Sequence, residues 1–95
     1  MKDTISYGLP VTIFREGAAF VAHSPALDLS SSGASEEEAQ RMFAEAVETF
    51  FEELIDMGTL DSVLKNLGWT KSKGRFQPPE VVRQSVMHVM VPLAA

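Results

Sequence analysis

The stretch SEEEAQRMFAEAVETFFEELIDMG, residues 35–58, decides the fold of this chain. Ser35 and Glu38 have the spacing of a capping box, in which each side chain bonds the backbone amide of the other residue. The acidic first turn also complements the positive end of the helix dipole. Apolar residues follow at helical spacing: Ala39, Met42, Phe43, Ala46, Val47, Phe50 and Leu54. With Gly58 as the stop signal, the sequence predicts a helix over 36–57.

Three short strands are predicted before this helix. Apolar and polar residues alternate through 11–15, which is the period of a half-buried strand. A polar turn with Gly17 follows, and the apolar segment 19–24 returns as the partner strand of a hairpin. Pro25 ends that strand, and the alternating segment 27–31 predicts a third strand.

The chain after the long helix predicts a second helix and a connector. Thr59 is placed to cap a short helix over 60–67, and Gly68 is placed to stop it. Basic residues, a glycine and a pair of prolines follow in the segment 70–84. Regular structure is not expected in that connector, because this composition is typical of loops.

The last segment, 85–92, is rich in valine and predicts a fourth strand. The order of elements is then β-β-β-α-(α)-β, a single α+β domain over 1–95 with one main helix packed on a small mixed sheet.

The composition indicates a globular protein of the cytoplasm. Hydrophobic residues make up 45% of the 95 residues, which is enough for one core. No apolar run approaches the roughly 20 residues of a membrane-spanning helix, and the N-terminus carries no secretory signal. The chain has no cysteine, which excludes a disulfide framework and a thiolate metal site.

The strongest surface signal is an acidic ridge along the long helix. The net charge of −5 is unevenly spread, since residues 36–61 hold nine acidic residues and one basic residue. The candidate partner-binding residues are Glu45, Glu48, Glu52, Glu53 and Asp56. Like charges four residues apart cost a helix a few tenths of a kcal/mol per pair. The ridge is therefore either a solvated helix face or a docking surface that speeds association with a basic partner.

The connector carries the opposite charge. Its candidate nucleic-acid-binding residues are Lys71, Lys73, Arg75 and Arg83. Trp69 before them and Phe76 among them supply aromatic rings of the kind that stack on single-stranded nucleic acid. A solvated loop, or an arm folded back on the acidic helix, explains the same residues without nucleic acid.

The sequence offers no convincing catalytic, metal or cofactor site. His23 and His88 fall on predicted strands, and neither has a carboxylate at a metal-binding spacing. The serines of 30–32 lie in a predicted turn without a base beside them, which nucleophilic catalysis requires. We therefore expect a binding protein and not an enzyme.

One set of residues is more specific than the composition. Pro25, Leu27, Gly33, Ser35, Glu38, Ala39 and Ala46 stand at the spacing of a known family motif. In this respect the chain resembles the HicB-like antitoxins, and the resemblance runs from about residue 11 to the end. The segment 20–25 is similar to the second strand of that family, and 58–69 is similar to a second helix found in some members.

The resemblance implies a fold, a partner and an activity. The family core is described as a truncated ribonuclease H-like fold of β-β-β-α-β order. Its members bind and neutralise HicA, a small basic toxin that cleaves RNA. Two alternatives stay open: a nucleic-acid-binding or orphan HicB-like module without a toxin, and a ribonuclease H-like nuclease. The nuclease needs an acid on the first strand, which residues 11–14 do not provide.

The chain departs from the family in two places. Many members continue into a DNA-binding domain, whereas this sequence ends shortly after the last predicted strand, so DNA binding is not expected. Asp28 and Leu29 stand where the family commonly has a glycine and a small residue, which puts in doubt any contact made there.

Self-association as a homodimer is also expected. Phe51 and Ile55 extend the apolar face of the long helix beyond the width that one sheet covers. The predicted strand 85–92 is apolar on both faces, and an open sheet edge with such residues invites further pairing. The alternative is that Trp69, Phe76 and the second helix cover this surface within one chain.

Overall fold

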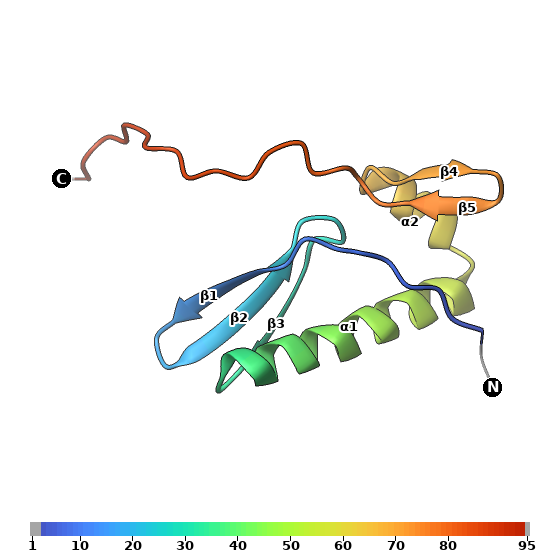
Figure 1. Cartoon of the computed structure of the whole chain (residues 1–95), viewed down its shortest axis with the longest axis horizontal. Coiled ribbons are helices and arrows are strands. Elements are labelled where there is room, and N and C mark those ends of the chain that lie inside the picture. Colours follow the sequence, from blue (N-terminus) through green and yellow to red (C-terminus); the bar gives the residue numbers. More distant parts are fainter. Residues whose placement is uncertain (1–2, 95) are drawn as a thin grey trace.

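The computed structural model describes residues 3–94 and has the α+β class predicted from the sequence. Its elements, in chain order, are β1 (Thr12–Glu16), β2 (Ala19–Ser24), β3 (Leu29–Gly33), α1 (Glu36–Met57), α2 (Leu60–Asn66), β4 (Thr70–Ser72) and β5 (Arg75–Gln77). The first three strands form one sheet, with α1 running beneath it (Figure 1). The α2 helix and the β4–β5 hairpin gather at the C-terminal end of α1 (Figure 1). None of the helices among the described residues is long and apolar enough to cross a membrane.

The three-stranded sheet is an antiparallel meander in the order β1-β2-β3. Gly17 has a φ of 59°, a left-handed conformation that allows the tight turn between β1 and β2. The third strand begins two residues later than predicted, because residues 25–28 form a turn. Asp28 takes a φ of 49° there, and its amide donates to the Pro25 carbonyl at 3.4 Å. Leu27, predicted as a strand residue, is instead a buried turn residue.

The α1 helix spans the predicted residues. Ser35 Oγ accepts a hydrogen bond of 3.1 Å from the Glu38 amide, and the Glu38 carboxylate accepts one of 3.3 Å from the Ala34 amide. The reaching-back bond therefore goes to the residue before the cap, which is a small departure from the usual capping box. At the other end Gly58 adopts the left-handed conformation of a helix stop.

The first core lies between the sheet and the N-terminal half of α1. Ala22 on β2 meets Ala39 and Phe43 on α1, and all three are buried. Gly33 makes this contact close, because a Cβ atom built there would lie 2.6 Å from the Ala39 amide nitrogen. The small residues at these positions bring helix and sheet together.

The second core lies at the other end of α1. Ala26, Leu27, Leu64, Trp69 and Phe76 are buried there, joined by half-buried residues of the N-terminal segment and α1. Although Thr59 precedes α2 as predicted, its side chain makes no capping hydrogen bond. Instead, its carbonyl accepts a hydrogen bond from the Ser62 hydroxyl at 3.1 Å.

The predicted connector over 70–84 is wrong in its first half, where β4 and β5 form a hairpin. Lys73 and Gly74 have φ values of 53° and 77°, so two left-handed residues in a row make the turn. A lysine in that conformation is uncommon, so residue propensities do not predict the hairpin.

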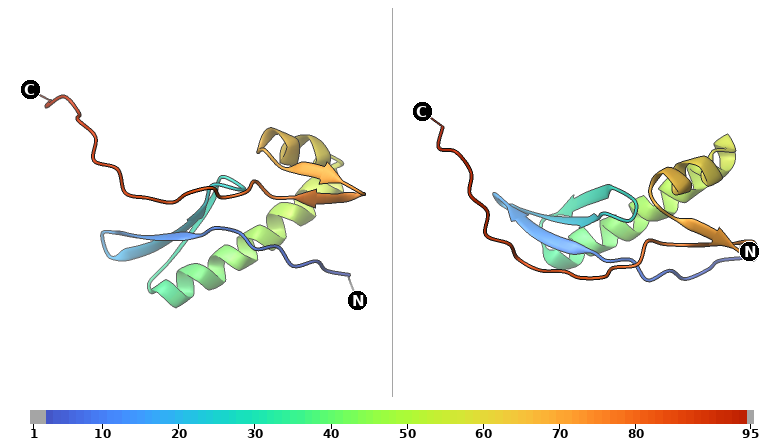
Figure 2. Two further views of the ribbon diagram at one scale, coloured as in Figure 1. Left: turned by 45° about the horizontal axis from the view of Figure 1, so that its top comes forward. Right: turned by 90° about the horizontal axis from the view of Figure 1, so that it is seen from above.

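The predicted strand over 85–92 is also wrong. Residues 78–94 belong to no helix or strand, so the described sheet has no parallel fourth strand and is antiparallel throughout. In Figure 2 this segment leaves β5, passes the sheet and extends away from it. Its side chains from Glu80 onwards are exposed, and residues 83–86 line a pocket together with residues 11–13 without pairing in a ladder.

Candidate partner-binding face

The acidic ridge lies on the side of α1 that the sheet leaves uncovered. The helix buries Ala39 and Phe43 against β2 and β3, which sets the direction of its other faces. The five predicted partner-binding residues then fall in two groups. Glu45, Glu48, Glu53 and Asp56 are exposed, and Glu52 is half-buried.

The ridge includes carboxylates without a basic neighbour in the described part of the chain. Within residues 3–94, no basic side chain lies within ion-pair distance of Glu48 or Asp56. The last turn of α1 carries no basic residue to complement the negative end of its dipole. A cation placed against this turn is therefore stabilised by both the carboxylates and the dipole, each by roughly 0.3–1 kcal/mol at an exposed site.

A groove borders this ridge. It runs between the N-terminal segment, residues 3–9, and the C-terminal half of α1, and its volume is about 480 Å³. Its apolar lining residues are Ile5, Tyr7, Leu9, Val47, Phe51 and Ile55. Asp3, Glu48 and Glu52 line it as well. The groove thus combines an apolar lining with acidic groups, a combination suited to a protein partner that presents an apolar side chain beside basic residues.

Trp69 holds the wall of the groove in place. Its indole nitrogen donates to the Ala26 carbonyl at 2.7 Å, in a buried hydrogen bond. The ring makes edge-to-face contacts with Tyr7 at 5.1 Å and with Phe51 at 6.1 Å, centroid to centroid. One side chain therefore links the N-terminal segment, the turn after β2 and α1. Because these contacts are buried, the groove is preformed on a rigid base.

The sequence did not predict the part of the groove contributed by the N-terminal segment. Ile5, Tyr7 and Leu9 alternate with small residues, which reads as the start of a strand. In the structure these residues pair with no strand, and Tyr7 and Leu9 pack on the second core. The alternation was the available signal, since it places three apolar side chains on one side of an extended segment.

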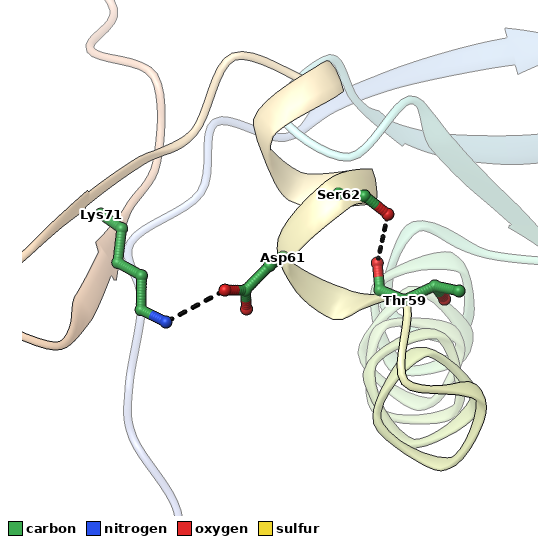
Figure 3. Close-up of polar contacts among 4 residues, drawn as sticks. All are labelled: Thr59, Asp61, Ser62 and Lys71. Atoms are coloured by element: carbon green, nitrogen blue, oxygen red, sulfur yellow. Dashed lines mark hydrogen bonds and ion pairs between the residues drawn. The ribbon is translucent and has the colours of Figure 1, made fainter.

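The four basic candidates do not form one surface. Lys71 on β4 is 3.1 Å from Asp61 on α2, and its ammonium lies 5.2 Å from the centre of the Phe76 ring (Figure 3 shows the ion pair). The ion pair attaches the hairpin to the first turn of α2, whereas the contact with Phe76 lies within the hairpin. The lysine is therefore occupied within the chain, although an exposed pair of this kind contributes at most about 1 kcal/mol.

The other three bases lie apart from this ion pair. Lys73 is in the turn of the hairpin. Arg75 pairs with Ser72 in the ladder, whereas Lys71 pairs with Phe76, so the side chains of Arg75 and Lys71 leave opposite faces of the hairpin. Arg83 is in the segment after β5. The four basic side chains are therefore not arranged as one continuous positively charged surface for binding nucleic acid.

Histidines and carboxylates do not converge on a metal site within the described residues. His23 Nδ1 lies 2.7 Å from the Ser30 hydroxyl across the β2–β3 ladder, a sheet contact between neighbouring strands. His88 lies in the exposed C-terminal segment. Glu16 is exposed at the end of β1, and residues 12–15 carry no acid.

The geometry thus singles out the groove and the acidic ridge as the candidate site. No protein-family model, curated protein sequence or solved structure matches this chain. The assignment of function therefore rests on the residues and contacts described above.

Proposed function

We propose that this chain is a HicB-like antitoxin that binds and neutralises a small basic, RNA-cleaving toxin of the HicA type. The observation that carries the proposal is the groove on α1 with its acidic rim. Glu48 and Glu52 border an apolar lining that includes Ile55, which is 60% exposed. A basic protein gains electrostatic steering from such a rim and buries apolar surface in its centre.

The residues that carry the family resemblance support the proposal by their roles in the fold. Gly33, Ser35, Glu38 and Ala39 form the junction of β3 and α1, through close packing and capping bonds. This junction sets the direction of α1 and hence that of the acidic ridge.

The proposal includes the setting and form of the protein. The chain acts in the cytoplasm, where an RNA-cleaving toxin meets its substrate, and it acts by binding and not by catalysis. It is a homodimer, and the three-stranded sheet with α1 forms a truncated ribonuclease H-like core in each copy.

The test is binding of the small basic protein encoded by the neighbouring reading frame. We expect the two purified proteins to form a complex, measured by titration calorimetry and stopped-flow fluorescence of Trp69. Replacing Glu48 with Gln and Asp56 with Asn removes two ridge charges and both like-charge helix pairs with Glu52. The association rate constant is expected to fall several-fold at low ionic strength. The difference between the variant and the unmodified chain should become smaller as added salt screens the electrostatic attraction.

A matched control changes the net charge equally at a distance from the ridge. Glu16 on β1 and Glu80 after β5 are both exposed, and the double replacement E16Q/E80Q also removes two charges. It is expected to bind at nearly the unchanged rate. Equal effects of both double variants would show a general charge effect and contradict a docking role for α1.

A third variant tests the apolar part of the groove. Ile55→Ala removes an exposed side chain, so the free protein should keep its stability. Because buried apolar anchors dominate binding energies, the complex is expected to dissociate faster by about tenfold or more. The absence of a small basic neighbour, or tight binding of single-stranded RNA by the chain alone, would favour an orphan or nucleic-acid-binding module.

A further inference from the structure

The segment after β5, residues 78–94, has a composition at odds with its exposure. From 86 to 93 its only polar side chain is that of His88, and the others are valine, methionine, proline and leucine. Three of these side chains are almost fully exposed: Val86 at 86%, Met90 at 99% and Leu93 at 97%. Solvated tails are rich in charged and polar residues, so this segment has the character of a buried one.

The exposed apolar area is of the size of an interface. A stable two-chain interface buries about 800 Å² on each partner, and six large apolar side chains between 86 and 93 are each at least two-thirds exposed. The radius of gyration is 16.1 Å, whereas a compact chain of this length has one of about 12–13 Å. The segment therefore extends away from the body and carries enough apolar surface for one partner.

The chain's own sheet can take up only part of this segment. The β1 strand is paired with β2 on one side, and its other edge has no strand beside it within residues 3–94. Residues 83–86 lie next to 11–13 along that edge. The segment and β1 run in the same direction in both figures (Figures 1 and 2).

The register leaves the last apolar residues without a neighbour. Both stretches advance by about 3.3 Å per residue when extended, so the end of β1 at Glu16 is level with about Val89. Met90, Val91 and Leu93 lie beyond the turn that follows β1, where the chain offers no sheet edge. An intramolecular fourth strand would therefore leave the most exposed residues of the segment uncovered.

We infer that residues 86–93 are a dimerisation arm that binds a second copy of this chain, the two arms lying antiparallel across a two-fold axis near Met90. Charge favours a second copy over a basic partner, because the arm has no acidic residue whereas α1 has many. A two-fold arrangement is self-complementary, so each arm supplies the apolar surface that the other needs. Antiparallel pairing also closes the open edges against further association.

This inference rests on the homodimer of the proposed function but not on the toxin. Its test uses the purified full chain alone, so failure here leaves toxin binding unaffected, and failure of toxin binding leaves the arm unaffected. Light scattering after size exclusion at micromolar concentration should give twice the 10.4 kDa of one chain. Met90→Lys should halve the measured mass, because the lysines of the two chains would lie side by side at the two-fold axis and their like charges would repel.

Controls separate the arm from the fold. Met90 is 99% exposed, so the M90K monomer should keep the near-ultraviolet circular dichroism of the buried Trp69. Val82 is also exposed but precedes the arm, so Val82→Lys should remain dimeric. A monomeric unmodified chain, or a dimeric M90K variant, would overturn the proposal.

The absence of cysteine allows a direct test of the axis. Met90→Cys introduces one thiol per chain, and mild oxidation should yield a covalent dimer on non-reducing electrophoresis. Asn66→Cys, exposed on α2, serves as the control for random collision. The arm proposal predicts cross-linking at least about tenfold faster at position 90, and equal rates at the two positions contradict it.

Discussion

Gly33 lies where β3 passes into α1, and the space there admits no side chain. The nearest atoms to a Cβ at this position belong to the backbone of Glu38 and Ala39, at 2.8 and 2.6 Å. The backbone of a capped helix cannot move aside in the way that the end of a flexible side chain can. The glycine thus determines how closely the helix approaches the sheet, and through it the position of the first core.

Gly33→Ala is expected to lower the free energy of unfolding by about 1–3 kcal/mol, because overpacking forces the helix away from the sheet. Gly8→Ala is the matched control, since a Cβ at Gly8 meets nothing within 4 Å and its φ lies outside the left-handed region. Urea unfolding followed by far-ultraviolet circular dichroism measures both. Equal stability of the two variants would contradict the close contact.

Ser24 ends β2 with a fully buried hydroxyl that has no hydrogen-bond partner among the described residues. Ser24→Ala removes a desolvated polar group and keeps the volume nearly unchanged, so it should stabilise the protein by about 1 kcal/mol. Ser30→Ala serves as the comparison, because that hydroxyl contacts His23 and its loss should not stabilise. A destabilised S24A variant would reveal a partner that this arrangement does not supply.

At the scale of elements, local signals predicted α1 and the strand β2 to the residue, but not the end of the chain. Capping residues and a long apolar stripe act within the element itself, so they are visible in the sequence. The hairpin of β4 and β5 depends on a lysine in a left-handed conformation, which propensity disfavours. The predicted strand over 85–92 has strand composition, but composition does not determine whether a segment pairs with an edge, and among the described residues this one pairs with none.

The same distinction applies to the candidate site. The acidic ridge was predictable, because its spacing follows from the helix. The groove beside it was not, because it requires the N-terminal segment to be held on α1 by Trp69, a contact between residues more than 60 positions apart in the chain. Lys71 was predicted to face nucleic acid, but it pairs with Asp61, a neighbour visible only in three dimensions.

The caps of the two helices give a test at this scale. Ser35→Ala removes the hydroxyl that accepts from the Glu38 amide, and it should cost about 1 kcal/mol of stability. Thr59→Ala changes the corresponding residue before α2, whose hydroxyl makes no capping bond and is buried without a hydrogen-bond partner among the described residues, so stability should not fall and should rise by up to about 1 kcal/mol. Urea midpoints compare the two variants, and an equal loss would mean that Ser35 does not act as a cap.

For the molecule as a whole, charge and apolar surface are separated. The acidic ridge and groove lie along α1, whereas the uncharged arm 86–93 extends past β1 (Figure 1). These surfaces suit the two proposed partners. The acidic ridge and groove suit a basic protein, and the arm suits a second copy of this chain. Binding of one partner therefore leaves the surface for the other exposed.

The most direct test of the central claim is inhibition of RNA cleavage. A small basic protein from a neighbouring reading frame, the toxin that the proposal expects, is incubated with a labelled RNA, and the purified chain is added in increasing amounts. Cleavage should fall linearly and stop near one chain per toxin, whereas E48Q/D56N should require an excess. Undiminished cleavage at a several-fold excess of the unmodified chain would contradict the assignment as an antitoxin.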